Sequence, residues 1–385
     1  MKILMFTTDY LPSVGGVAAH VYELARATRQ AGHEVTVVTN VQDTDGAGSV
    51  DPLPRVLRVS DRIRLLPITR GRRLQFAVNM VRPMLGELRG FDVVHFHTVD
   101  PLARTLSLIW TQQPQIATNH ASMFVSDAGD PRRVVPWERF FRRMDGIIAP
   151  SEELADLTAA VTGKADRVRY IPNGVDASRF HPDVSGRPCR ESYGIRPDEP
   201  LILCPRRLVK KNGCIFLARA MRAVIEAEPS ARLLFAGEGP ERQNVERALD
   251  EAACLDRTVF AGSIPNSDMP AVYAAADVVV IPSLIEATSI SALEAMAAAR
   301  PVVASRTGGL PALVQNAHTG CLVEPGDESG LAAALCDLLA DPNKRTRMGA
   351  VARRRVLRDF TWDRVAAATI SACKTFLARS RREVA

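Results

Sequence analysis

The stretch DVVVIPSLIEATSISALEAMAAARPVVAS, residues 277–305, contains an apolar run, a turn, an alanine-rich segment and a second apolar run. Both apolar runs are rich in β-branched residues and nearly free of polar ones, which is typical of strands buried on both faces of a sheet. Alanine favours helix in the segment between them. Strand, helix and strand in this order predict a crossover unit of a parallel sheet.

The same alternation runs along the whole chain of 385 residues. Helices are expected at about residues 17–31 and 72–89, between strand-like runs. These runs are KILMF, EVTVVT, RVLRVS, DVVHFH, QIAT and GIIAP in the first half, and LILCP, ARLLFAG, TVFAG, DVVVIP, PVVAS and GCLV in the second. We therefore predict an α/β protein with two doubly wound, Rossmann-like parallel sheets.

The length of the chain suggests two domains, each large enough for its own core. Residues 173–199 are rich in proline, glycine, serine and charge, which is the composition of a linker. We predict an N-terminal domain over 1–172, a C-terminal domain over 200–360, and a last helix, 361–385, that packs back on the first. Ligands bind beyond the carboxyl ends of strands in such sheets, so two facing domains predict one deep cleft.

The composition is that of an ordinary globular protein, with 46% hydrophobic and 24% charged residues. The N-terminal apolar run is too short for a secretory signal, and no run has the length of a membrane span, so we expect a cytoplasmic protein. Seven cysteines without a C-x-x-C pair predict reduced thiols and no zinc site. The net charge of +6 favours anionic partners, but no nucleic-acid-binding motif accompanies it.

Two carboxylates, Glu286 and Glu294, lie in the otherwise small and apolar segment that follows a predicted strand. Glu286 falls in the turn, where it is either a solvated loop acid or a ligand-binding group. Glu294 has two interpretations. If the helix begins at Ser291, the pattern Ser291-Ala-Leu-Glu294 is a capping box. If the helix begins two or three residues earlier, its N–H groups face a phosphate and Glu294 accepts hydrogen bonds from a ribose.

Glycines occur at three predicted strand ends. Gly15 and Gly16 precede the first helix, AGEGP contains Gly237, and TGGLP follows PVVAS. Glycine lets a backbone approach a ligand closely, and a helix N-terminus offers N–H groups to an anion. Each turn alone is also compatible with a plain connection, but three together favour a phosphate-rich ligand. None is G-x-G-x-x-G, so a dinucleotide site is not supported.

These pieces together resemble the retaining glycosyltransferase family 4. Glu286 and Glu294 match its E-x7-E signature, and further matching segments span nearly the whole chain: YLPSVGGVAAHVYELARATRQAGHEV, APSEELAD, IPNGVDASRF, RRLVKKNG, AGEGP and YAAADVVVIPS. The resemblance implies the GT-B fold of two Rossmann-like domains. It also implies a nucleoside-diphosphate-sugar donor, held mainly by the C-terminal domain, and transfer with retention of configuration.

Carried over residue by residue, the resemblance implies that Glu294 contacts the donor ribose and Glu286 the hydroxyls of the transferred sugar. Gly15 and Gly16 are expected to approach the diphosphate, and His120 is expected to be a catalytic residue near the sugar and the reacting centre. Further donor contacts are implied for Gly237, for the base-reading segment Ser263–Ile264, and for backbone N–H groups of Ala287, Thr288, Ser289 and Ile290. The turn EATS departs from the common EGFG, which bears on the sugar accepted.

Negative charge grows on the leaving diphosphate, and fixed cations stabilise it. The family supplies an arginine and a lysine in G-R-L-x-x-x-K-G. Aligned on Arg207 and Gly213, the lysine position is Asn212, so we assign the role to Arg207 and Lys211, with Arg206 as the substitute. Front-face retention needs no protein nucleophile, because the departing phosphate takes the acceptor's proton. Glu286 is therefore expected to position the sugar, and no metal or other cofactor is expected.

Three other signals are discounted. Asp43-Thr-Asp45 is a D-x-D, the metal-binding pattern of another glycosyltransferase fold. Here it lies in a polar loop of a different architecture. His95-x-His97 places two imidazoles on one face of a strand, but no third ligand is apparent, which favours a structural or acceptor-side role. PRRVVPWERFFRRM, residues 131–144, is basic and aromatic, and an amphipathic helix covering the sheet is favoured over peripheral membrane contact.

The sequence thus predicts a retaining, metal-independent hexosyltransferase. We expect it to transfer glucose or N-acetylglucosamine, and a UDP-sugar is the preferred donor. The expected acceptor is a hydroxyl of a small polar metabolite, such as an aminocyclitol in secondary-metabolite (antibiotic) biosynthesis. A lipid-linked or polysaccharide acceptor is the second choice, and GDP- or ADP-sugars stay open. Other classes are a GT-B epimerase or hydrolase, a non-catalytic nucleotide-sugar-binding module and a nucleic-acid binder. No oligomeric state follows from the sequence.

Overall fold

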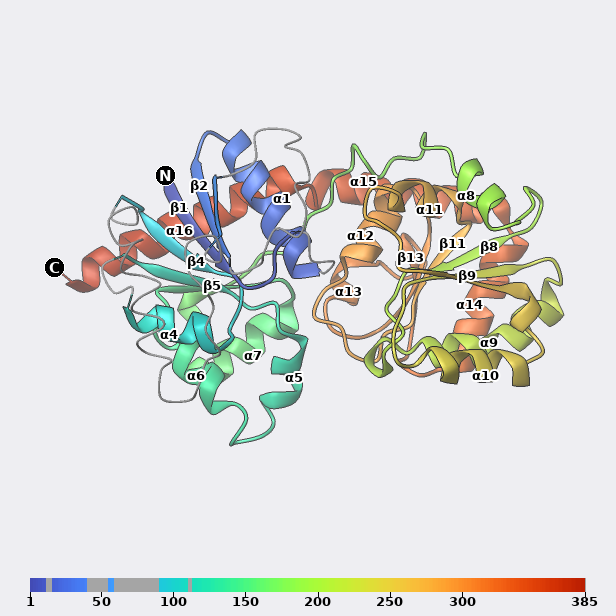
Figure 1. Ribbon diagram of the computed structural model, residues 1–385, viewed down its shortest axis with the longest axis horizontal. Helices are drawn as coiled ribbons and strands as arrows, with labels where there is room; N and C mark the ends of the chain where they lie inside the picture. Colours follow the sequence, from blue (N-terminus) through green and yellow to red (C-terminus); the bar gives the residue numbers. More distant parts are fainter. Residues whose placement is uncertain (12–15, 40–54, 59–89, 110–112, 385) are drawn as a thin grey trace. The chain divides into compact units, whose positions relative to one another are not determined.

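The computed structural model describes residues 1–11, 16–39, 55–58, 90–109 and 113–384. They form two compact units, each described here by itself. The first unit is Met1–Asn173 with Trp362–Ala385, and the second is Gly174–Thr361. Figure 1 shows that each unit is a parallel sheet with helices on both faces. The predicted α/β class with two doubly wound sheets is confirmed.

The described part of the first unit contains a parallel sheet in the order β3-β2-β1-β4-β5-β6-β7. The strands are β1 (Lys2–Thr7), β2 (Glu34–Thr39), β3 (Arg55–Arg58), β4 (Val93–Phe96), β5 (Gln115–Thr118), β6 (Gly146–Ala149) and β7 (Val168–Tyr170). The helices are α1 (Gly16–Gln30), α4 (Pro101–Ile109), α5 (Ser122–Asp127), α6 (Val135–Phe141), α7 (Glu152–Thr162) and α16 (Trp362–Val384), with a 3-10 turn at Ala165–Arg167.

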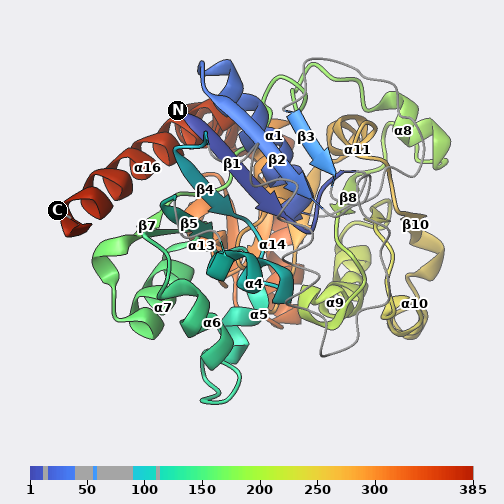
Figure 2. The same ribbon diagram turned by 60° about the vertical axis from the view of Figure 1, so that its left-hand side comes forward.

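The last helix, α16, lies next to α1 on one face of the first sheet (Figure 2). Its apolar side chains, among them Trp362, Cys373 and Phe376, join a core with residues of α1, β1 and β2. The strands interlock in register, for example Met5 opposite Val37 on one side and His95 on the other. Since each central strand is covered on both faces, its apolar run is nearly continuous.

The second unit contains a parallel sheet in the order β10-β9-β8-β11-β12-β13. The strands are β8 (Leu201–Cys204), β9 (Arg232–Ala236), β10 (Thr258–Gly262), β11 (Val278–Ile281), β12 (Val302–Ser305) and β13 (Gly320–Val323). The helices are α8 (Arg187–Ser192), α9 (Cys214–Ala227), α10 (Arg242–Glu251), α11 (Met269–Ala275), α12 (Ile290–Ala297), α13 (Leu310–Leu313), α14 (Glu328–Ala340) and α15 (Pro342–Asp359), with 3-10 turns at Lys210–Asn212 and Leu255–Arg257.

Two apolar cores, one on each face, hold the second sheet. One is formed largely with α11, α12 and α15, and the other with α9, α10 and α14. The six strands predicted for this half are all present. In the first half the sequence missed β7, because Arg169 interrupts its apolar run and the strand lies at the sheet edge. The predicted helix at 72–89 lies outside the described residues.

The linker predicted for residues 173–199 is wrong for nearly all of its length, because the segment from Gly174 belongs to the second unit. Val175 and Phe180 are buried in its core, and the short helix α8 occupies part of the segment. The Val175 N–H donates to the Phe360 carbonyl (N···O 2.9 Å), so the two segments at which the chain passes between the units run side by side. The few buried apolar residues are widely spaced among prolines and glycines. The composition of the segment therefore resembles that of a linker although the segment is part of a folded unit.

All seven cysteines are free thiols, which agrees with the expectation of reduced cysteines, although Cys321 and Cys336 are only partly buried. Across the described helices, none is both long enough and apolar enough to cross a membrane.

Candidate functional site

The loops that follow the strands of the second unit all emerge at one edge of its parallel sheet. Arg206 follows β8, Gly237 follows β9, Ser263 follows β10 and Glu286 follows β11. This is the carboxyl edge, at which open α/β sheets bind their ligands. The E-x7-E pair and the basic loop predicted from the sequence are therefore brought to the same edge.

Glu286 is held by Arg206. The Arg206 guanidinium forms an ion pair with the Glu286 carboxylate, and both side chains are only 12% exposed. The same guanidinium nitrogen donates to Ser283 Oγ (2.9 Å) and Asn212 Oδ1 (3.0 Å). Ser283 also donates to Glu286 Oε2 (3.2 Å). Glu286 is thus neither a solvated loop acid nor free to rotate, because two donors orient its carboxylate.

This arrangement changes the assignment of the arginine. Arg206, which the sequence offered only as the substitute, contacts Glu286, whereas the Arg207 side chain is exposed. Arg206 and Lys211 are five residues apart, the spacing of the family's arginine and lysine, and Asn212 is the added residue before Gly213. Asn212 is buried, and its Nδ2 donates to the Arg207 carbonyl (2.8 Å). The preference for Arg207 over Arg206 is therefore not supported by the geometry.

Lys211 completes the positive side of the cluster. Burial lowers the pKa of the Lys211 ammonium, the nearby Glu286 carboxylate opposes this shift, and Arg206 and Arg207 add to it. The Lys211 carbonyl accepts the N–H groups of Leu284 (2.8 Å) and Ile285 (3.2 Å). The loop that carries the two cations is thereby tied to the loop that carries Glu286.

Two of the predicted glycine turns allow these loops to contact each other closely. Gly237, with φ of +154°, lies so close to the Arg206 carbonyl that a Cβ would collide with it. Gly308 of the TGGLP turn, with φ of +55°, approaches the Glu286 carbonyl in the same way. Glycine is needed at both positions because backbone meets backbone there and because the φ values disfavour other residues. The structure thus gives these glycines a role that does not require a phosphate.

The helix that carries Glu294 begins before Ser291, so the capping-box interpretation is wrong. Ser289 is the N-cap of α12, and its Oγ accepts the Ala292 N–H (3.2 Å). Glu294 lies in the second turn, where its Oε2 accepts the hydroxyl of buried Tyr273 (2.7 Å). Desolvation raises the pKa of Glu294 to about 7, although the Tyr273 hydrogen bond and the charge of Arg179 act in the opposite direction.

The other predicted donor residues lie close to this cluster in sequence and differ in exposure. Ala287 is buried, and the hydroxyl of Thr288 is buried without a hydrogen-bond partner in the described chain. Ile290 is the first residue of α12, while the buried Ser289 hydroxyl is engaged by its cap. Ser263 is exposed, and Ile264 packs at the edge of the core.

The sequence missed three residues of this cluster: Ser283, Asn212 and Tyr273. In the sequence, Asn212 stands out only as a departure from the family lysine. Tyr273 stands in the segment YAAADVVVIPS and lies 21 residues before the glutamate it bonds, so only the fold reveals the contact. Ser283 precedes Glu286 by three residues in a turn and carried no separate signal.

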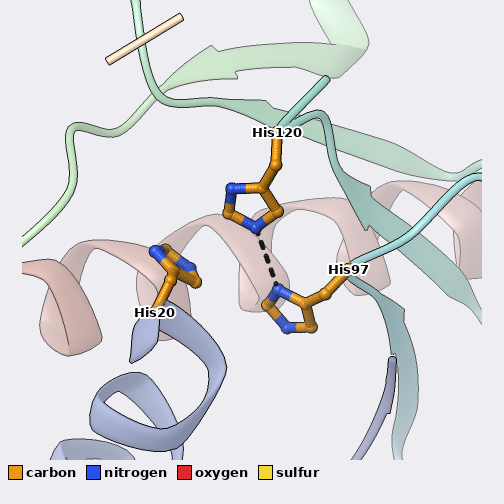
Figure 3. A group of neighbouring side chains, drawn as sticks. All are labelled: His20, His97 and His120. Carbon is orange, nitrogen blue, oxygen red and sulfur yellow. Dashed lines mark hydrogen bonds between the residues drawn. The ribbon is translucent and has the colours of Figure 1, made fainter. Parts of the chain in front are cut away.

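The first unit contributes a second cluster at the carboxyl edge of its own sheet. His120 follows β5, His97 follows β4, and His20 projects from α1 toward both, as Figure 3 shows. His97 Nδ1 and His120 Nε2 are 3.3 Å apart. Burial lowers the pKa of His20 to about 4 and holds the pKa of His120 well below its ordinary value, with the neighbouring histidines adding to the latter shift. Burial thus favours the neutral form of these rings.

The remaining predicted features of the first unit have mixed outcomes. Gly16 is the exposed first residue of α1, while Gly15 and the Asp43-Thr-Asp45 pattern lie outside the described residues. Residues 131–144 include α6, in which Phe140 and Phe141 are buried. Trp137 Nε1 donates to Asp127 (3.1 Å) and its ring stacks with Phe141. The favoured interpretation, a helix packed on its own unit, agrees with these contacts.

Comparison with known proteins accounts for both halves of the chain. The family model for Glycosyltransferase Family 4 matches residues 14–179, and the model for Glycosyl transferases group 1 matches residues 187–355. The chain is 31% identical to D-inositol 3-phosphate glycosyltransferase of Xylanimonas cellulosilytica, over 92% of this chain and 90% of that protein.

Two further proteins are similar over nearly their full length. The GDP-mannose-dependent alpha-(1-6)-phosphatidylinositol monomannoside mannosyltransferase of Mycolicibacterium smegmatis is 29% identical, over 94% of this chain and 95% of that protein. The solved structure of sucrose-phosphate synthase from Thermosynechococcus elongatus superposes with a TM-score of 0.81 at 27% identity, covering 98% of this chain and 99% of that one. The protein is therefore a glycosyltransferase of the GT-B fold and a member of glycosyltransferase family 4.

Proposed function

We propose that this glycosyltransferase transfers a hexose from a nucleoside-diphosphate sugar to an acceptor hydroxyl with retention of configuration and without a metal. The observation that carries the proposal is the cluster of Arg206, Lys211 and Glu286 at the carboxyl edge of the second unit. It combines two cations with one oriented carboxylate. Cations suit a diphosphate, and a carboxylate suits sugar hydroxyls.

In the transition state, negative charge grows on the departing diphosphate. Arg206 is held in place by its hydrogen bonds and Lys211 is partly buried, so both can stabilise that charge with little reorganisation. Glu286 is oriented by Arg206 and Ser283, which fits a group that positions the sugar. The leaving phosphate then takes the proton of the acceptor hydroxyl as the new glycosidic bond forms. Glu294, paired with Tyr273 in the ligand-free chain, is proposed to accept the ribose hydroxyls.

For the donor we propose a UDP-sugar carrying glucose or N-acetylglucosamine, on the strength of the family resemblance. GDP is the main alternative, because the mycolicibacterial relative is named for GDP-mannose. Backbone contacts of Ser263 and Ile264 are proposed to read the base. Gly15, Gly16 and Gly237 are proposed donor contacts, and the role of His120 near the sugar stays a prediction.

For the acceptor we propose a small polar metabolite of the cyclitol type, used in the cytoplasm in secondary metabolism. The relative at 31% identity is named for D-inositol 3-phosphate, itself a cyclitol phosphate. A lipid-linked acceptor is the alternative, since the mannosyltransferase is named for a phosphatidylinositol mannoside. The inward packing of Trp137 and Phe141 favours the first choice, because these aromatic groups are engaged within their own unit.

The first test is thermal unfolding with UDP, GDP, ADP and TDP, each in EDTA. A ligand that binds only the folded state raises its stability. We expect one diphosphate to raise the midpoint clearly, in wild type and in Arg207→Ala, and to have a weaker effect in Arg206→Ala. Stabilisation by none of the four would contradict a metal-free donor site.

The second test is turnover of the matching sugar nucleotide with and without cyclitol acceptors. Transfer that requires acceptor and keeps the anomeric configuration supports the proposal. Conversion of the sugar nucleotide without acceptor would instead identify an epimerase or hydrolase. Binding without any turnover, in the presence of varied acceptors, would favour a binding module.

A further inference from the structure

Four of the chain's seven histidines gather in the first unit, and transfer as proposed above uses only one of them. His95 and His97 lie on β4 and just after it, with ring centroids 4.0 Å apart. His20 and His120 meet edge to face, with centroids 4.4 Å apart. The rings come from one helix and two neighbouring strand ends, so the fold itself assembles the group.

Three of these rings surround one point. His20, His97 and His120 each offer one ring nitrogen, and these three atoms lie within 4.8 Å of one another. The closest pair, His97 Nδ1 and His120 Nε2, is 3.3 Å apart. Two imidazole nitrogens bound tetrahedrally to one zinc ion, with bonds of about 2.0 to 2.1 Å, lie about 3.3 Å apart. That pair is hydrogen-bonded in the ligand-free chain, and its separation matches the one that a shared metal ion requires, so an ion would replace this hydrogen bond.

The third ring is prepared by a neighbour. Asn173 Oδ1 lies 2.9 Å from His20 Nδ1 and, as a carbonyl oxygen, it accepts a hydrogen bond from that nitrogen. This bond leaves the lone pair of His20 on Nε2. Metal-binding histidines in proteins are commonly oriented in this way, by a carbonyl or carboxylate on the nitrogen that does not bind metal.

The cluster is costly as a plain core. His97 Nε2 and His95 Nδ1 are buried, and neither has a hydrogen-bond partner in the described residues. His97 is 1% exposed and His95 is 0% exposed. Unsatisfied buried polar atoms are uncommon in native proteins, so this group of rings is unfavourable as an ordinary part of a core. Neither nitrogen is among the three that would bind the ion, so the ion is inferred from the geometry of the other nitrogens. Burial also keeps the rings uncharged, since the pKa of His97 is held well below its ordinary value.

We propose that His20, His97 and His120 form a binding site for one transition-metal ion, Zn²⁺ or a neighbouring ion such as Co²⁺ or Ni²⁺. Three imidazoles without a carboxylate suit these borderline ions and do not suit Mg²⁺ or Ca²⁺, which prefer oxygen ligands. Three protein ligands leave a fourth position for water or a ligand hydroxyl.

The site has a consequence that rests on the proposed function. A bound ion takes the lone pair of His120, the residue expected near the transferred sugar. Occupancy of the site therefore inhibits transfer, and the ion is a regulator of the reaction rather than a participant in it.

The test begins with metal binding to the full-length chain, without any substrate. Protein stripped with EDTA and dialysed is titrated with Co²⁺ and followed by its visible d–d absorption, and Zn²⁺ is then added to displace it. We expect one Co²⁺ per chain, with the strong absorption of a tetrahedral site. His97→Gln and His20→Gln lower the affinity more than 100-fold, and Asn173→Ala, which removes only the orienting acceptor, lowers it about 10- to 100-fold.

His318→Gln is the matched control, because His318 is an exposed histidine of the second unit. It is expected to bind Co²⁺ as the wild type does. Circular dichroism of each metal-free variant establishes that it folds. If the buried variants do not fold, X-ray absorption spectroscopy of the Zn²⁺-loaded wild type counts the imidazole ligands, and fewer than two overturns the proposal.

Absence of saturable Co²⁺ or Zn²⁺ binding to the wild type overturns the proposal. So does binding that survives unchanged in folded His20→Gln and His97→Gln, or binding that His318→Gln abolishes. The donor site is tested separately, by nucleotide binding in EDTA. The metal-site proposal and the proposed function can therefore fail independently of each other. Inhibition is measured as the ratio of the transfer activities with and without Zn²⁺, determined separately for each variant. If His97→Gln gives the same ratio as the wild type, the regulatory role is contradicted.

Discussion

Both units gather polar side chains at the carboxyl edge of a parallel sheet, but the two groups differ in charge. In the second unit Arg206 and Glu286 form an ion pair that is almost fully buried, with Ser283 and Asn212 as further partners. In the first unit the buried rings are neutral, and two ring nitrogens have no hydrogen-bond partner in the described chain. The charged group is held together by several hydrogen bonds, although Arg206 Nε also lacks a partner in the described chain, whereas the neutral rings make few hydrogen bonds.

The largest expected effect comes from breaking the ion pair. Arg206→Ala leaves Glu286 buried without its cation, which costs about 3 kcal/mol of unfolding free energy. His97→Leu in the first unit removes a neutral ring with one unsatisfied nitrogen and one hydrogen bond to His120, so it is expected to cost less, about 1 kcal/mol. Urea unfolding of both variants measures the difference. Equal losses of unfolding free energy in the two variants would show that the charged cluster does not stabilise its unit more than the neutral cluster stabilises the other.

Arg207→Ala is the matched control for the arginine, since the neighbouring side chain is exposed and its change should stay within about 0.5 kcal/mol. In transfer assays, loss of Arg206 should lower kcat by about 100-fold or more, the effect of losing one preorganised donor to a developing negative charge. A larger loss of turnover in Arg207→Ala would return the role to the arginine that the sequence favoured.

The next effect is a pH dependence within the second unit. Burial raises the pKa of Glu294 from 4.5 to about 7, so between these values the native state binds more protons than the unfolded state. Stability from this group is therefore full below pH 4.5 and is lost as the pH rises toward 7. Glu294→Gln should remove this slope and exceed the wild type above pH 7 by roughly 2 kcal/mol, a figure reduced for the partial exposure of the side chain.

The measurement is the unfolding free energy of wild type and Glu294→Gln across this pH range. Asp268→Asn is a suitable control, because Asp268 is exposed and lies in the same unit. Parallel curves for wild type and Glu294→Gln would mean that the pKa of Glu294 is not raised by burial. Glu294 would then be charged at neutral pH, like the other acid of the second unit.

The strands of the second unit could be predicted because β-branched runs such as Val278–Ile281 have no polar interruption. The edge strand β7 could not, because Arg169 interrupts it. The sequence also favoured Arg207, whereas in the structure Arg206 contacts Glu286. Consecutive side chains of an extended segment point in opposite directions, so a shift of one residue decides which of them meets Glu286. Only the packing of the loops against one another settles that choice.

The histidine cluster shows a second limit. The pair His95-x-His97 is visible in the sequence because both side chains share one face of a strand. His20 lies far from it along the chain, and its approach depends on how α1 packs on the sheet. The sequence therefore showed two imidazoles and no third ligand, while the fold brings His20 and His120 to the same point.

A smaller effect is expected at Tyr273, whose hydroxyl donates to Glu294 Oε2. Tyr273→Phe removes this donor and keeps the ring, so it should cost about 1.5 kcal/mol where Glu294 is ionised. Since the hydrogen bond lowers the pKa of Glu294, its loss should move the pH transition of stability upward. Unfolding curves at pH 6 and 8 test this, and a cost equal at both pH values would argue against coupling to the carboxylate.

The smallest effect concerns where α12 begins. Ser289 caps the helix through the Ala292 N–H, so Ser289→Ala should cost about 1 kcal/mol. Ser291→Ala leaves the cap intact and removes a hydroxyl that hydrogen-bonds Tyr273, so it should cost less, about 0.5 kcal/mol. Urea unfolding of the two variants, which differ only in the position of one hydroxyl, ranks the two serines. If Ser291→Ala were the more costly, Glu294 would belong to a capping box after all. Its carboxylate would then serve its own helix, and the second unit would lose one of the two acids assigned to the donor.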